Sequence, residues 1–187
     1  MGKIKYGISN VHYAVATDDG TGRLTYGDVK KLPGAVSLNM DAEGDTIEEY
    51  ADNVSWYNDI VNNGYAGTLE LESLPEEFES EVFGRKKGTK GGILETDKDQ
   101  TKEVALLWQF EIGGDSTVKG KRGLLYRVKF SRNGESGETK EKTIKPNHVQ
   151  LKFSATPRIN DGYIKFSAKT GDEVYSKWFT QVTEITG

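Results

Sequence analysis

The chain has no cysteine among its 187 residues, which excludes disulfides, thiolate metal ligands and a thiol nucleophile. No apolar run approaches the roughly 20 residues of a membrane-spanning helix, and residues 1–10 lack the apolar core of a signal peptide. The 29 acidic and 25 basic residues give a net charge of −4, without the basic excess typical of nucleic-acid binders. We therefore expect no signal-dependent export, no membrane insertion and no specific binding of nucleic acid.

Apolar and polar residues alternate with a period of two along most of the chain, as in strands with one buried face. The clearest segments are residues 35–42, 103–112 and 124–130. The last two are expected to form an antiparallel pair, with the even-numbered residues from Leu124 to Phe130 on one face. The length suits one domain, so the sequence predicts a single, mainly β domain over residues 1–187.

Glycine is abundant: its 22 residues exceed the usual share of roughly 7% and predict many turns and bulges. Residues 43–45 (Glu-Gly-Asp) predict a turn directly after the strand at 35–42. Residues 160–162 (Asn-Asp-Gly) predict a hairpin between segments 148–156 and 163–170.

One α-helix is expected, at about residues 74–83. Ser73 and Glu76 have the spacing of a capping box, in which each side chain bonds a free amide at the helix start. Phe78 and Val82 lie four residues apart on one face, with glutamates on the other. The pattern predicts an amphipathic helix that flanks the sheet.

Three segments have no steady period. Residues 84–102 are rich in glycine and charge and are expected to form a flexible, solvated loop that begins where Gly84 ends the helix. Residues 46–63 form a long excursion that could hold a short strand at 53–57, and such connections are often functional. Residues 173–185 suit either a helix or a strand.

The search for chemistry yields no catalytic, cofactor or metal residues. His12 and His148 lie in strand-like segments far apart and are best interpreted as ordinary strand residues. Residues 113–122 lack the Ser or Thr that must follow the lysine of a phosphate-binding loop. The acidic residues at 41–45 miss the calcium-loop spacing, and the lysines at 86–90 are balanced by nearby acids. We expect no enzyme and no cofactor.

Four aromatic residues gather in or beside the excursion: Tyr50, Trp56, Tyr57 and Tyr65. Such residues often anchor protein interfaces. They also serve to cap a domain's own core, and the sequence favours neither interpretation.

Eight segments, in this order and spacing, resemble the major tail protein (tail tube protein) of long, non-contractile-tailed bacteriophages of Gram-positive hosts. They are residues 5–14 (KYGISNVHYA), 31–45 (KLPGAVSLNMDAEGD), 50–57 (YADNVSWY), 62–78 (NNGYAGTLELESLPEEF), 118–132 (VKGKRGLLYRVKFSR), 138–146 (ETKEKTIKP), 151–158 (LKFSATPR) and 177–179 (KWF). Some relatives carry a C-terminal immunoglobulin-like domain, which is not expected here.

The resemblance implies a tail-tube fold: an antiparallel β-sandwich or partial barrel with one flanking α-helix. It implies a structural virion protein that forms stacked hexameric rings around a tape-measure protein. Tail terminator and distal tail proteins would be its other partners. DNA would pass through the lumen without specific binding, which suits a mildly acidic chain. The expected location is the phage tail, after assembly in the host cytoplasm.

Rings would also close strand edges that otherwise invite uncontrolled pairing. We hypothesise that residues 46–63 reach a neighbouring subunit or ring. Two alternatives stay open: a related component such as a tail terminator or adaptor ring, and a carbohydrate-binding β-sandwich.

Overall fold

The computed structural model describes residues 4–114, 119–135, 137 and 147–185. Residues 115–118, which belong to the segment compared above with a phosphate-binding loop, lie outside these ranges, and so does the whole segment at 138–146. The elements, in chain order, are β1 (Ile4–Asp18), β2 (Leu24–Tyr26), β3 (Lys30–Lys31), β4 (Ala35–Glu43), β5 (Thr46–Ala51), β6 (Val54–Ile60), β7 (Gly64–Leu71), α1 (Glu76–Val82), β8 (Lys86–Lys87), β9 (Ile93–Leu94), β10 (Glu103–Gly113), β11 (Gly120–Phe130), β12 (Val149–Ala155), β13 (Lys165–Lys169) and the 3-10 turn η1 (Glu173–Tyr175).

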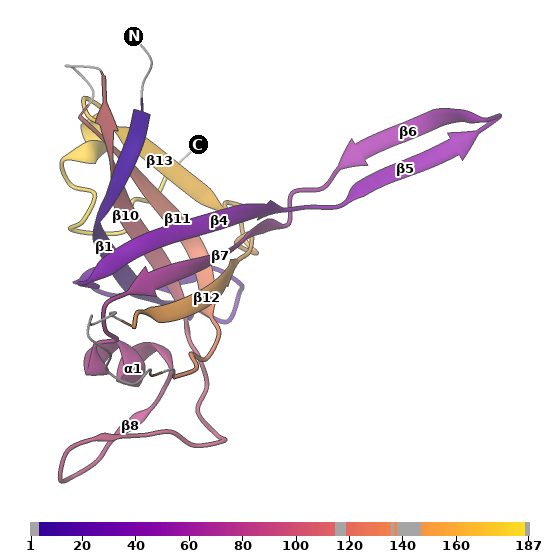
Figure 1. Ribbon diagram of the computed structural model, residues 1–187. Helices are drawn as coiled ribbons and strands as arrows, with labels where there is room; N and C mark the ends of the chain where they lie inside the picture. Colours follow the sequence, from indigo (N-terminus) through magenta and orange to yellow (C-terminus); the bar gives the residue numbers. More distant parts are fainter. Residues whose placement is uncertain (1–3, 115–118, 136, 138–146, 186–187) are drawn as a thin grey trace.

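The fold is mainly β, as predicted, and it is built on one antiparallel sheet with the strand order β2-β1-β10-β11-β12-β7-β4. The sheet bends so that β4, β7 and β12 cross in front of β1, β10 and β11 (Figure 1). Its two ends do not meet, so the arrangement is a β-sandwich and not a closed barrel.

The main core fills the space between these two layers. The strand predicted at 103–112 supplies Val104, Leu106 and Trp108 from one layer, and β7 and β12 supply Leu69 and Leu151 from the other; all are buried. The alternation seen in the sequence therefore matches burial in these three strands, because every second side chain of β7, β10 and β12 points into the sandwich.

A second apolar cluster lies on the opposite face of β10 and β11. Ala105 and Leu107 meet Trp178 and Val182 there, all buried. The C-terminal segment is neither the helix nor the strand considered for 173–185. It is the short turn η1 followed by irregular chain, and Trp178 anchors it by stacking on Phe166 with ring centroids 5.2 Å apart.

The α-helix spans Glu76–Val82 and covers one end of the core with Phe78 and Val82, as predicted. The predicted capping box is wrong. Pro75 is the N-cap residue and no side chain caps the helix. Because the helix begins at Glu76, Ser73 and Glu76 do not occupy the N-cap and N3 positions that a capping box joins. Gly84 ends the helix with φ +75°, a conformation that glycine adopts without strain.

The predicted alternation of β11 fails at one place. β10 and β11 pair antiparallel as expected, but the register shifts between the pairs Val104–Val128 and Leu106–Leu125. This bulge inserts an extra residue into β11 and reverses the faces on either side of it. Leu125 therefore joins the main core, whereas Leu124 joins the second cluster.

The hairpin predicted around residues 160–162 is also wrong. β12 pairs with β11 at Val128–Phe130, and β13 pairs with β11 at Lys121–Leu125. The two strands lie along the same edge of β11 but then separate. β12 continues into the layer formed with β7 and β4, whereas β13 stays in the layer of β10 and β11. A turn signal fixes the local backbone at 160–162 but not the partner of the strands beside it.

Among the described residues, no helix is long and apolar enough to cross a membrane.

Candidate assembly interface

The most unusual feature of the molecule is a two-stranded arm, β5 and β6, that projects far from the sandwich (Figure 1). The arm continues the β4–β7 pair, whose register runs to Glu43–Gly64. Backbone bonds from Asn63 N to Glu43 O and from Val61 N to Asp45 O, both 2.9 Å, join the two ladders. The turn predicted at 43–45 is therefore wrong: the chain runs straight on and reverses only at the tip of the arm.

The tip is a two-residue turn in which Asp52 and Asn53 both have positive φ, 52° and 61°. This is the type I′ geometry that suits the twist of paired strands, and Asp and Asn tolerate it better than other side chains. The Asp-Asn pair was thus a usable hairpin signal. The strand considered at 53–57 is longer, Val54–Ile60, and pairs with β5 at every residue except Trp56.

The arm packs against no other part of the chain that the structure describes. Every residue of β5 and β6 is exposed, including Tyr50 at 68%, Trp56 at 76% and Ile60 at 74%. Isolated two-stranded hairpins are marginal in water, and contiguous apolar groups on a monomer surface mark sites of interaction. The exposed aromatics are therefore surplus to the fold of a single chain.

Trp56 owes its position to a bulge. Glu49 pairs with Tyr57, and Tyr50 pairs with Ser55, so Trp56 is the extra residue of β6. Bulges re-aim side chains and raise local twist, which places the largest apolar side chain of the arm outside the regular cross-strand pairing.

The arm is also acidic. It carries four carboxylates, Glu48, Glu49, Asp52 and Asp59, and no basic residue. Removing these four from the 29 acidic residues leaves 25, which equals the 25 Lys and Arg residues. The whole formal charge of the chain thus resides in its arm, and a surface that binds it should be basic and apolar.

Of the four aromatics considered as either an interface or a core cap, Tyr50, Trp56 and Tyr57 all lie on the arm. Tyr65 is separate. It lies in β7, pairs with Ala155 of β12, and is half-buried against the main core. The interpretation as core cap thus fits Tyr65, whereas no part of the described chain covers the other three.

The loop predicted at 84–102 contains the small β8–β9 ladder, which projects beyond the helix (Figure 1). Its base is fixed by Arg85, which is buried and forms ion pairs with Glu79 and Glu95. The sequence did not distinguish this arginine from the exposed lysines that follow it.

Each of the two histidines contacts a side chain from another part of the fold. His12 stacks on Phe179 with ring centroids 4.5 Å apart, and burial lowers its pKa despite a hydrogen bond with Asn10 O. His148 Nδ1 lies 3.3 Å from Glu70 Oε1. Within the described residues, no group of three His, Asp or Glu side chains is placed to hold a metal ion.

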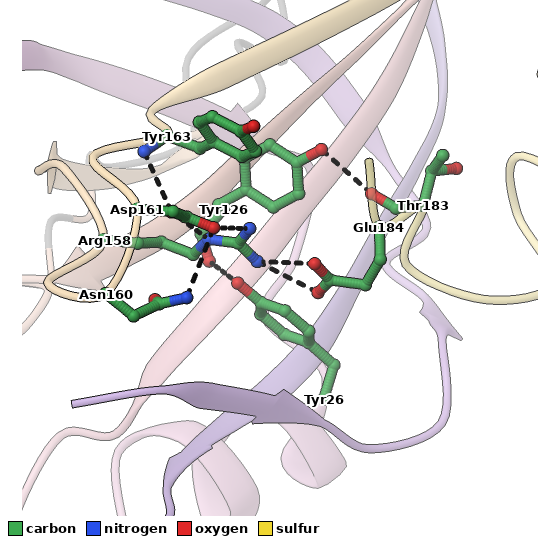
Figure 2. Close-up of polar contacts among 8 residues, drawn as sticks. All are labelled: Tyr26, Tyr126, Arg158, Asn160, Asp161, Tyr163, Thr183 and Glu184. Atoms are coloured by element: carbon green, nitrogen blue, oxygen red, sulfur yellow. Dashed lines mark hydrogen bonds and ion pairs between the residues drawn. The ribbon is translucent and has the colours of Figure 1, made fainter. Parts of the chain in front are cut away.

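Sequence reasoning missed one buried polar cluster, centred on Arg158 (Figure 2). Its guanidinium is 3% exposed and forms ion pairs with Asp161 and Glu184, the latter at 2.9 Å. It also lies over the Tyr126 ring, 4.4 Å from the centroid. Tyr126 Oη in turn donates to Thr183 O at 2.9 Å, so the cluster fastens the C-terminal segment to the sheet.

The charges of this cluster shift the titration of its members. Burial alone would raise the pKa of Asp161, but hydrogen bonds from Arg158 and the Tyr163 amide outweigh it and lower that pKa. Burial raises the pKa of Tyr26 to about 12, and its hydroxyl donates to Tyr126 O at 2.9 Å. Because the charged groups of Arg158, Asp161 and Glu184 and the hydroxyls of Tyr26 and Tyr126 all have partners, we interpret the cluster as a structural clamp.

A comparison with models of known protein families and with curated proteins finds no match to this chain.

Proposed function

We propose that this chain is a tail-tube protein of a long, non-contractile-tailed bacteriophage, a structural component and not an enzyme. It assembles into hexameric rings that stack into the tube through which DNA is delivered. The observation that carries the proposal is the arm: an uncovered hairpin, acidic and rich in aromatics, extended from a well-packed β-sandwich. Such an element gains stability only by binding another surface.

The open ends of the sheet also support assembly. β4 is a nine-residue strand at one end of the strand order, with no further partner among the described residues. Long open edges are avoided in proteins that stay monomeric. A ring of six copies covers such edges through one repeated heterologous contact.

The remaining partners follow from the sequence resemblance. A tape-measure protein would fill the lumen during assembly, and tail terminator and distal tail proteins would close the two ends. DNA would later pass through without specific binding. The protein would reside in the virion, after assembly in the host cytoplasm.

The first test is the particle size of the purified protein, measured by light scattering with negative-stain electron microscopy on the same sample. Rings or tubes with a central bore are the expected result, either from the protein alone or on co-expression with the tape-measure and tip proteins. Single rings that never stack would instead indicate a terminator or adaptor ring. A monomer under both conditions would contradict the proposal.

A further inference from the structure

A groove opens at the base of the arm, between the diverging strands of the sandwich. One part is lined by Asn62 and Tyr65 on one side and by the residues around Lys165 on the other. A second part, lined by Phe110, adjoins it and shares Lys121 and Lys165. We call the two parts together the lysine groove.

Three exposed lysines dominate this groove. Lys165 Nζ lies 4.9 Å from the centroid of the Tyr65 ring, and Lys5 Nζ lies 4.4 Å from that of Phe110. Partial burial, together with the charges of Lys121 and Lys5, lowers the pKa of Lys165. The lysines therefore lie close enough to repel one another.

No carboxylate compensates these charges within the described residues. Neither part of the groove is lined by an aspartate or a glutamate, although the body as a whole has equal numbers of acids and bases. A basic hollow with aromatic walls is left, and it favours an occupant that is both acidic and apolar.

β13 adds a backbone component to the groove. It pairs with β11 on one edge, and no other strand of the described chain pairs with it. Its residues Lys165, Phe166 and Ser167 line the groove. An extended segment in the groove would thus lie beside an unpaired strand edge, which is the geometry of strand addition.

We propose that the lysine groove of one subunit is the receptor for the β5–β6 arm of a second copy of this chain. The arm supplies four carboxylates and three exposed aromatics, which match the three lysines and the aromatic walls. This inference rests on the proposed function and names the surface that the arm binds.

The observations favour a second copy over other occupants. Asn62, at the base of the arm, lines the groove, and the subunit's own arm points away from the body (Figure 1). Nucleic acid would satisfy the lysines but would leave Tyr50, Trp56 and Ile60 of the arm exposed. Docking between copies covers both surfaces at once, and as a head-to-tail contact it repeats from subunit to subunit.

A charge-reversal cycle tests the pairing in the full-length protein. K121E/K165E reverses the groove, E48K/E49K reverses the arm, and a quadruple variant carries both. Each double variant should raise the protein concentration at which scattering by assemblies begins by more than about tenfold, because like charges then meet. The quadruple variant should return it to near the wild-type value, as expected only for residues that interact directly.

The matched control is K98E/K102E, which lowers the net charge as much as K121E/K165E but lies in the loop beyond the helix. It should assemble like the wild type. Circular dichroism and thermal melts confirm that every variant is folded, and all substituted side chains are exposed.

Each outcome decides between the two proposals. If K121E/K165E assembles normally, or if the quadruple variant is not rescued, the pairing is wrong while the tail-tube proposal stands. Oligomers that obey the charge cycle but never form rings or tubes would support the pairing and contradict the tube. A wild type that never self-associates contradicts both. Loss of oligonucleotide binding by K121E/K165E, with assembly unchanged, would assign the groove to nucleic acid instead.

Discussion

At the scale of single residues, the three tryptophans divide into two groups by burial. Trp108 and Trp178 are 2% and 0% exposed and belong to the two cores, whereas Trp56 is 76% exposed on the arm. The sequence alone did not separate them, because all three stand in alternating or aromatic-rich segments. Whether a tryptophan is buried depends on whether other elements pack over its side of the sheet. That arrangement is a property of the whole fold and not of the local sequence.

Substituting alanine for these residues should therefore have opposite consequences. Trp178→Ala empties a packed site and should lower the free energy of unfolding by about 3–5 kcal/mol. Trp56→Ala removes no contact in the single chain and should change it by less than about 0.5 kcal/mol, yet abolish assembly. Urea unfolding and light scattering measure the two effects. A Trp56→Ala protein that still forms tubes would contradict the role assigned to the arm.

The Arg158 clamp predicts a pH dependence of stability. Arg158→Met should lower the free energy of unfolding at pH 7 by about 3 kcal/mol, the lower part of the range for breaking a buried ion pair, because Glu184 is half-exposed. Since the pKa of Asp161 is lower in the folded state, its contribution is complete above the unfolded value of 3.8. It is lost as the pH falls through the folded-state pKa.

The difference in stability between wild type and Arg158→Met should thus shrink between pH 5 and pH 2. Urea titrations across this interval measure it. The control is Arg132→Met, which breaks an exposed pair with Glu95 and should change stability little at any pH. A wild-type advantage over Arg158→Met that stays constant down to pH 2 would show that Asp161 is not coupled to the arginine.

At the scale of elements, local sequence patterns predict those helices and strands whose formation depends mainly on nearby residues. The strands at 35–42, 103–112 and 124–130, the helix with Phe78 and Val82, and its stop at Gly84 follow from alternation, amphipathicity and backbone freedom. The predictions are wrong where the facing or pairing of a strand depends on its partner strand. The bulge in β11 and the separate pairing of β12 and β13 are decided by how the sheet bends, which a single strand does not encode.

The arm was the hardest element for the same reason. A strand is usually recognised in a sequence by apolar residues at every second position, which form its buried face. β5 and β6 have no buried face, so their sequences show no such alternation. The Asp52-Asn53 turn was the remaining local signal. The sequence therefore marks residues 46–63 as irregular and rich in aromatics, but it does not reveal that they form a hairpin.

Removing the arm should leave the body intact. Replacing residues 44–63 by Asn-Gly keeps the β4–β7 register to Glu43–Gly64 and joins the strands with a favoured two-residue turn. The shortened protein should unfold at nearly the wild-type temperature, because the arm contributes no buried residue, but it should form no tubes. Differential scanning calorimetry and electron microscopy check the two halves of this prediction. Normal tubes from the shortened protein would refute the assembly role.

At the scale of the whole molecule, the chain separates a neutral body from an arm that carries its net charge of −4. A subunit therefore offers one acidic, apolar projection and one basic, aromatic groove. If the arm binds the groove of a second copy as proposed, the contact is heterologous and leaves a free arm at one open end and a free groove at the other. Growth would then continue until the contacts close or an end is blocked.

Arm-deleted subunits should consequently block growth. They lose Asn62 from the lining of the lysine groove but keep Tyr65 and all three lysines, so they can accept an arm but have none to offer to the next subunit. Added to wild-type protein in rising proportion, they should progressively shorten the tubes measured by electron microscopy. The matched control combines the deletion with K121E/K165E; it can neither offer nor accept an arm and should leave tube length unchanged. Equal effects of the two proteins would mean that the arm is received elsewhere, since the state of the groove would then not matter.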